Sequence, residues 1–177
     1  MIENQKYWFA ARTRDKQEFA IRKFLEKLKT EEHLDLECYL PTRTVVTQLK
    51  YRKKQSEVPV VRNLIFIRAT KQTALDVPNV YGAHLFYMRD LSTRSLLVVP
   101  DKQMEDFMFV MDLNPQGICF DSEPLAVGHK VKVIKGDLCG IEGEITTAGH
   151  KTYVVIRIKD ILTASIKVPK SYLKIIK

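Results

Sequence analysis

The chain has 177 residues, enough for one large domain or two small ones. Its 45% hydrophobic and 28% charged residues are ordinary for a globular protein, and no apolar run is long enough to span a membrane. The net charge of +8 favours a polyanionic partner such as nucleic acid, although it could also serve solubility alone. Three scattered cysteines and the lack of a signal-peptide core predict a cytoplasmic protein without disulfides.

The N-terminal part begins with an aromatic strand over residues 7–11. A helix follows, for which Asp15 and Glu18 are expected to form a capping box as N-cap and N3 residues. Its apolar residues recur with the spacing of one helical face: Ile21, Phe24, Leu25 and Leu28. The sequence therefore predicts a strand followed by an amphipathic helix.

Two strands at residues 36–40 and 45–49 precede a returning strand at 58–69, so residues 50–56 are the predicted tip of a long hairpin. From Arg43 to Lys71 the chain has eight basic residues and one acid, Glu57. Such a basic arm could be a solvated surface or a contact to a phosphate backbone, with Tyr51 stacking on an exposed base. The candidate nucleic-acid-binding residues are Lys50, Arg52, Lys53 and Lys54.

The next elements are a central apolar strand at residues 63–67, a short helix at 70–76 that ends before Pro78, and a strand at 80–88. A further helix opens at Pro100 and has an apolar stripe of Met104, Phe107, Met108 and Met111, which is more typical of a core than of a binding face. This order predicts an α+β fold with an antiparallel sheet and flanking helices.

Proline and glycine interrupt the pattern over residues 114–124, where we expect a linker without secondary structure. Beyond it, apolar residues alternate from Val127 to Ile145 around Gly136, Gly140 and Gly143, and further short strands follow. About five strands in such a short segment predict a small SH3-like β-barrel, which is a binding module without room for an enzyme cleft. The predicted division is an N-terminal domain at 1–113, a linker at 114–124 and a barrel at 125–177.

The glycine-rich segment resembles the KOW motif of elongation factors and ribosomal proteins. Five more stretches match in order: Lys6-Tyr7-Trp8, the helix at 18–28, Leu40-Pro41-Thr42, residues 61–66, and Asp101-Lys102-Gln103-Met104 at the last helix. Together they resemble the NusG-type transcription elongation and antitermination factors, which join a ferredoxin-like NGN domain to a KOW domain. The chain is more similar to the specialised RfaH and UpxY paralogues of capsular polysaccharide operons than to general NusG.

The resemblance implies that the NGN domain binds the clamp helices of the largest subunit of bacterial RNA polymerase through an aromatic and aliphatic cavity. Tyr7 and Trp8 would form its walls, and Val61, Leu64 and Phe66 its floor. Alternation sends Tyr7 and Trp8 to opposite faces of the sheet, and we expect Tyr7 to be the outward-facing residue beside Phe66 and Val61. Trp8 and Phe66 could instead fill the core. Residues 61–64 depart from the family's Phe-Pro-Gly-Tyr and predict a smaller cavity.

For the KOW domain the resemblance implies contact with ribosomal protein S10 or the termination factor Rho, through a position that corresponds to Ile161 and Leu162. The glycine and arginine of the family's turn are missing here, which argues against Rho. The resemblance and the basic hairpin also imply contact with upstream or non-template DNA or with nascent RNA.

Two other classes of protein remain to be weighed. A KOW-type RNA-binding module resembling ribosomal proteins would use the basic loops, but it would not explain the amphipathic helices of residues 1–113. An enzyme is disfavoured because the four histidines stand alone, and neither a nucleophile elbow nor a phosphate-binding glycine loop is present in the sequence. We therefore expect no catalytic residue, no cofactor and no metal.

Overall fold

The computed structural model describes residues 4–121, 128–148, 150–159 and 161–176. The chain forms two compact units, Met1–Asp101 and Lys102–Lys177. Each unit is described by itself. Residues 122–124 of the predicted linker and Val127 lie outside the described residues.

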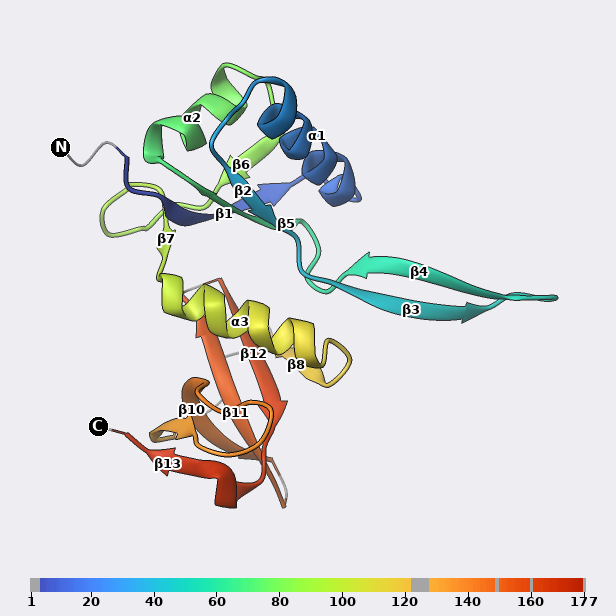
Figure 1. Ribbon diagram of the computed structural model, residues 1–177, viewed down its shortest axis with the longest axis vertical. Helices are drawn as coiled ribbons and strands as arrows, with labels where there is room; N and C mark the ends of the chain where they lie inside the picture. Colours follow the sequence, from blue (N-terminus) through green and yellow to red (C-terminus); the bar gives the residue numbers. More distant parts are fainter. Residues whose placement is uncertain (1–3, 122–127, 149, 160, 177) are drawn as a thin grey trace. The chain divides into compact units, whose positions relative to one another are not determined.

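The first unit is built on an antiparallel sheet with the strand order β2-β5-β1-β6, and a further short strand, β7, also pairs with β1. Helices α1 and α2 lie on the same face of this sheet (Figure 1). An α+β unit with an antiparallel sheet was predicted, and it is confirmed. The elements are β1 (Tyr7–Thr13), α1 (Glu18–Glu31), β2 (Glu37–Tyr39), β5 (Leu64–Ala69), α2 (Lys71–Asn79), β6 (Leu85–Tyr87) and β7 (Val98–Val99).

Alternate residues of the central strands form the core under the helices. Phe9 and Ala11 of β1 lie in one cluster with Ile65 and Ile67 of β5. The predicted helix face completes this cluster with Ile21, Leu25 and Leu28. Burial of each large aliphatic side chain stabilises the fold by about 1.5–3 kcal/mol. The apolar face of α1 and the alternate residues of β1 and β5 thus pack into a single core.

The start of α1 differs from the predicted capping box. The N-cap residue is Gln17, which makes no side-chain capping bond, and Glu18 is the first helical residue. Glu18 is only 3% exposed, and its Oε1 accepts a hydrogen bond of 2.8 Å from the backbone N–H of Asn63. The carboxylate therefore ties the helix to the loop before β5 and does not cap the helix.

Helix α2 extends further than predicted. Thr70 caps it by accepting a hydrogen bond from the Thr73 N–H, and Pro78 lies inside its last turn. The helical pattern continues past the proline because the Val80 N–H donates to the Asp76 carbonyl at 2.8 Å. Gly82, with a φ of 70°, then turns the chain, so that only residues 85–87 of the predicted strand at 80–88 are β-structure.

Strands β3 (Thr42–Gln48) and β4 (Lys53–Pro59) form a separate two-stranded sheet. This hairpin projects from the body of the first unit (Figure 1). Its register pairs Gln48 with Lys53 and Thr42 with Pro59. The predicted hairpin is therefore present, but its turn is shorter than expected and β4 already begins at Lys53.

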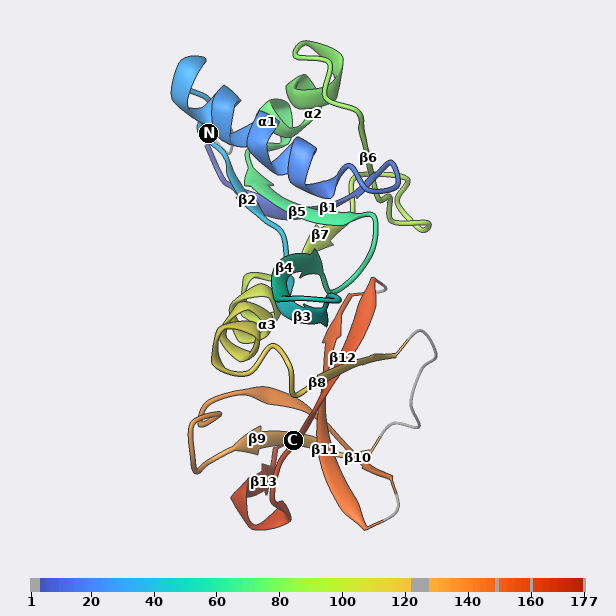
Figure 2. The ribbon, with the colours of Figure 1, turned by 90° about the vertical axis from the view of Figure 1, so that its right-hand side faces the viewer.

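The second unit contains α3 (Asp101–Leu113) and a six-stranded antiparallel sheet with the order β13-β9-β10-β11-β12-β8 (Figure 2). Among the described strands no hydrogen-bonded pair joins β13 to β8, so the expected closed barrel is not observed. The strands are β8 (Ile118–Asp121), β9 (Lys130–Val133), β10 (Glu142–Ala148), β11 (Lys151–Ile158), β12 (Leu162–Lys167) and β13 (Leu173–Ile175).

Strand β8 corrects the prediction that the segment at 114–124 has no secondary structure. Its residues Ile118 and Phe120 pair with Ile166 and Ala164 of β12. The ring of Phe120 also packs edge-on against Phe107 of α3, with the ring centroids 6.2 Å apart. The pairing partner lies far along the chain, which is why local composition did not indicate a strand.

Polar contacts also fix α3 within the second unit. The Gln103 Oε1 accepts a hydrogen bond of 3.0 Å from the Lys159 N–H, and the Asp106 Oδ2 accepts one of 3.4 Å from the Glu142 N–H. Gly143 follows in β10, where a Cβ atom would lie 2.4 Å from the Val155 carbonyl oxygen. The glycine of the KOW-like pattern is thus needed for the close approach of two strands.

Candidate functional site

The face of the first sheet opposite α1 and α2 is defined by the strand register. Directly paired residues share a face, and Ala10 pairs with Phe66 while Arg12 pairs with both Leu64 and Phe86. Alternation adds Trp8 to the same side. We call this surface the second face; its residues used below are Trp8, Ala10, Arg12, Leu64, Phe66 and Phe86.

The prediction that Tyr7 faces outward beside Phe66 is wrong. Tyr7 is partly buried and packs against the helix-covered core, and its ring centroid lies 6.2 Å from that of Phe9. Trp8 is the aromatic residue that shares a face with Phe66. The alternation itself was predicted correctly, but the side of the sheet was inverted, because Phe9 and Ala11 are the residues that pack under the helices.

Most of the predicted cavity residues are buried. Leu64 and Phe66 are fully buried and Trp8 is 6% exposed, whereas Val61 is half-buried in the loop before β5. The Phe66 ring lies 6.5 Å from that of Tyr39. The structure thus brings Trp8, Leu64 and Phe66 to one face, and it places Tyr7 on the other.

An aromatic residue at the edge of the second face was missed by the sequence analysis. Phe86 is 64% exposed on the edge strand β6, directly opposite the exposed Arg12. The succession Leu85-Phe86-Tyr87 indicates only that Phe86 lies on the opposite face from its two neighbours, because only alternate residues of a strand can pack under the helices. Leu85 and Tyr87 do so, which leaves Phe86 on the second face.

The loop that carries Val61 ends at Asn63, whose backbone is hydrogen-bonded on both sides. Asn63 has a φ of 59°, a backbone region that asparagine tolerates better than most residues and glycine best of all. This is the position of glycine in the family's Phe-Pro-Gly-Tyr, so Asn63 can fulfil the same backbone role. Its N–H is fixed by Glu18, and its carbonyl oxygen accepts a hydrogen bond of 3.2 Å from the Thr13 N–H.

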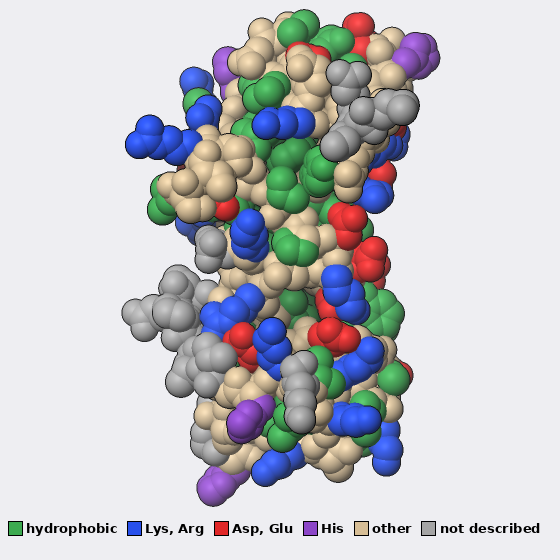
Figure 3. Space-filling model, turned by 90° about the vertical axis from the view of Figure 1, so that its left-hand side faces the viewer, with side chains coloured by type: hydrophobic (Ala, Val, Ile, Leu, Met, Phe, Trp, Pro, Cys, Tyr) green, Lys and Arg blue, Asp and Glu red, His purple; other side chains and the backbone are tan. Residues whose placement is uncertain are grey.

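The hairpin brings together all four predicted nucleic-acid-binding residues. Lys50 and Arg52 lie in the turn, Lys53 and Lys54 open β4, and all four are exposed. Within the described part of the chain none of them has a carboxylate within 4.0 Å. The face drawn in Figure 3 differs, because basic side chains there lie among acidic ones. The hairpin tip is therefore a local concentration of uncompensated positive charge.

The hairpin's acid, Glu57, lies at the base of the hairpin and away from its tip. Its Oε1 accepts hydrogen bonds from the Thr42 hydroxyl at 2.7 Å and from Arg22 of α1 at 3.2 Å. These two donors, Thr42 first, lower the pKa of Glu57 below its ordinary value. The carboxylate thus anchors the hairpin to the helix and does not offset the charge of the tip.

The predicted partner site of the second unit lies at the turn between β11 and β12. Ile161 is in that turn, where its N–H donates to the Ile158 carbonyl at 2.8 Å, and Leu162 is the first residue of β12. Both side chains are half-buried. Their placement leaves part of each available for contact.

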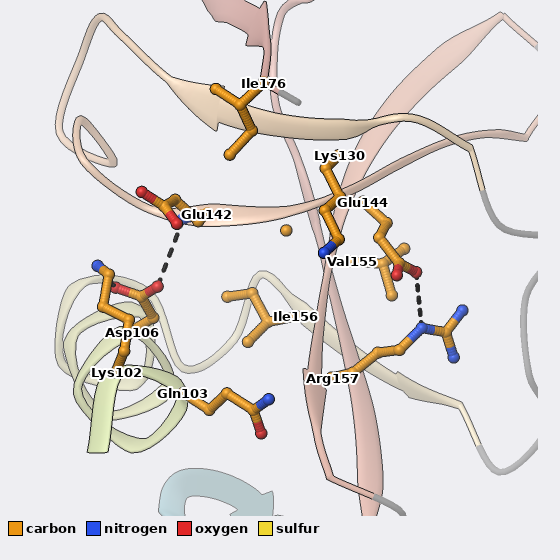
Figure 4. A pocket seen from close by; sticks show the side chains of 11 residues that line it. Lys102, Gln103, Asp106, Lys130, Glu142, Glu144, Val155, Ile156, Arg157 and Ile176 are labelled. Atoms are coloured by element: carbon orange, nitrogen blue, oxygen red, sulfur yellow. Dashed lines mark hydrogen bonds and ion pairs between the residues drawn. The ribbon is translucent and has the colours of Figure 1, made fainter. Parts of the chain in front are cut away.

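A cavity of about 220 Å³ lies between α3 and the strands of the second unit (Figure 4). Its charged groups are largely satisfied by one another: Lys102 pairs with Asp106 at 2.6 Å, and Arg157 pairs with Glu144 at 2.7 Å. The charges that line this cavity are therefore balanced. No group of three or more potential metal ligands occurs among the described residues.

No described helix has both the length and the apolar character that a membrane span requires.

Comparisons with known proteins identify the family. The family model described as transcription termination factor nusG matches residues 6–108. No match was found among curated proteins.

Several solved structures resemble the chain. One, described as the domain interaction in Thermotoga maritima NusG, covers 98% of this chain and 98% of its own, with 16% identity and a TM-score of 0.54. Conformations A and B of the MjSpt4:Spt5 complex each cover 96% of this chain and 98% and 97% of their own. Their identities are 16% and 18%, with TM-scores of 0.34 and 0.36. Since the family model spans more than half of the sequence, the chain belongs to the NusG family of non-enzymatic transcription factors, with an NGN fold in its first unit.

Proposed function

We propose that this protein is a transcription elongation and antitermination factor that binds RNA polymerase at the exposed edge of the second face of its first unit. The contact would be to the clamp helices of the largest subunit, and its effect would be read-through of terminators in particular operons. The observation that carries the proposal is Phe86, a large aromatic residue that is 64% exposed and lies directly opposite the exposed Arg12 at the edge of this face. Aromatic residues and arginine are enriched at protein interfaces.

The other contacts proposed here follow from the rest of the chain. The basic hairpin would lie at upstream or non-template DNA or at nascent RNA. The second unit would be a KOW module that meets ribosomal protein S10 through Ile161 and Leu162, and not Rho. The division into domains at 1–113 and 125–177 stays a prediction, as does a cytoplasmic location.

Polymerase binding by the full chain tests the proposal. Phe86→Ala should lower the affinity for bacterial RNA polymerase by about thirtyfold, because an aromatic anchor can contribute roughly 2 kcal/mol. Co-purification of the two proteins should be lost accordingly. Read-through of a terminator in a purified transcription assay should fall in parallel. Phe86 is exposed, so its replacement should leave the fold intact.

A matched control is Val80→Ala, which removes an apolar side chain that is 69% exposed at the end of α2. This variant should bind like the unmodified protein. Added clamp-helix fragment should compete for the unmodified protein. Equal binding by the Phe86 and Val80 variants would place the polymerase contact elsewhere.

A further inference from the structure

We propose that the tip of the β3–β4 hairpin is a binding site for single-stranded nucleic acid, in which Tyr51 stacks on an unpaired base. This inference rests on the nucleic-acid role proposed above for the hairpin and specifies its ligand. The site consists of Tyr51 together with Lys50, Arg52, Lys53 and Lys54.

Tyr51 is presented as a stacking surface. Its side chain is 88% exposed, and the Lys50 Nζ lies 5.4 Å from the ring centroid. The ammonium group thus occupies one face of the ring through a cation–π contact, and the exposed remainder is open to a ligand. The turn that carries the ring is closed by a hydrogen bond of 2.8 Å from the Leu49 N–H to the Arg52 carbonyl. The closed turn fixes the backbone that carries the ring, so less backbone freedom is lost when a base stacks on it.

The cations near the ring are arranged for a phosphate backbone. Lys53 pairs with Gln48 and Lys54 with Thr47, so the two lysines project from opposite faces of the ribbon. Glu57, the acid nearest in sequence, is bonded to Thr42 and Arg22 at the other end of the hairpin. A single strand of nucleic acid that passes over the tip would therefore meet positive charge on either side of Tyr51.

The combination favours single strands over duplexes. In a duplex the faces of the bases are stacked on one another, so an exposed ring gains little from it, whereas an unpaired base offers a free face. Phosphate contacts alone would not discriminate, because both forms carry a charged backbone. Tyr51 is thus expected to supply the preference and the lysines the general affinity.

The test measures binding of the full chain by fluorescence anisotropy to labelled oligothymidylate of about twelve nucleotides, and to a duplex of the same length. The unmodified protein should prefer the single strand. Tyr51→Ala should weaken single-strand binding about tenfold, leave duplex binding within about twofold and not change the salt dependence. Tyr51→Phe retains the ring and should bind like the unmodified protein, while Tyr51→Leu, which keeps an apolar side chain without an aromatic face, should behave like Tyr51→Ala.

A second variant separates charge from stacking. The double substitution of Lys53 and Lys54 by Ala should weaken binding to both probes and reduce the single-strand salt slope by about 1.4, or about 0.7 for each lost phosphate contact. Equal affinity of the unmodified protein for both probes, no binding to either, or equal loss on both probes in Tyr51→Ala would overturn the inference. Polymerase binding, measured without nucleic acid, should be unaffected by Tyr51→Ala, so a failure of the polymerase contact and a failure of this site are distinguishable.

Discussion

A substitution at Glu18 in α1 should destabilise the loop before β5, because Glu18 is hydrogen-bonded to Asn63 of that loop. Glu18→Ala removes the acceptor for the Asn63 N–H, to which the carboxylate is bonded at 2.8 Å, and Glu18 is 3% exposed. A buried donor left without a partner costs about 1–3 kcal/mol, and hydrogen bonds to charged groups lie in the upper part of the usual range. We expect the free energy of unfolding to fall by about 2 kcal/mol in Glu18→Ala, and by about half as much in Glu18→Gln, which retains a neutral acceptor.

Urea unfolding followed by tryptophan fluorescence measures this loss, because Trp8 is the chain's one tryptophan and lies in β1 of the first unit. Glu26→Ala, on the exposed side of the same helix, is the control and should change stability by no more than about 0.5 kcal/mol. The reasoning would be refuted if Glu18→Ala and Glu26→Ala unfolded alike. Asn63→Gly should be nearly neutral and Asn63→Ala should cost about 1 kcal/mol, since the φ of 59° strains an alanine.

Two further predictions concern titratable groups. Iodoacetamide should modify the exposed Cys119 and Cys139 before Cys38, because burial raises the pKa of the Cys38 thiol; equal rates by mass spectrometry would contradict this. The Glu57 carboxylate should titrate below its ordinary pKa, and Thr42→Val should raise that pKa, as followed by NMR. Because the folded-state pKa is the lower one, Glu57 contributes stability above its unfolded-state pKa, and this contribution is lost as the pH falls through the folded-state pKa. An unchanged Glu57 titration in Thr42→Val would show that the hydroxyl is not its main partner.

The helix faces were predictable because their signal is local. Ile21, Leu25 and Leu28 repeat within one short segment, and any helix with that spacing must bury them together. Such a face needs no knowledge of the rest of the chain. The hairpin was predictable only in part: strand-forming residues precede its turn, but the polar residues 53–56, which were predicted as turn, belong to β4.

Strand β8 and the role of Glu18 were not predictable in this way. Ile118 pairs with Ile166, and Glu18 bonds to Asn63, so each depends on a segment far away in the sequence. The glycine and proline before β8 indicated a linker because they do break local structure. Whether a strand then forms depends on the edge of β12 that it meets, and local composition carries no information about that edge.

The assignment of the candidate polymerase-binding face depends on which alternate residues of β1 face the helices. Alternation places Tyr7 and Trp8 on opposite sides of β1, but it does not say which of the two sides faces the helices. Turning the strand over would move every side chain to the other face of the sheet. Phe9 and Ala11 settle the orientation through their packing under the helices, which puts Trp8 with Phe66. Once that side is known, the pairing of β1 with β6 places Phe86 on the same face as its partner Arg12. The exposed aromatic residue of the second face is therefore a consequence of which residues α1 and α2 cover, and it could not be assigned until their packing was known.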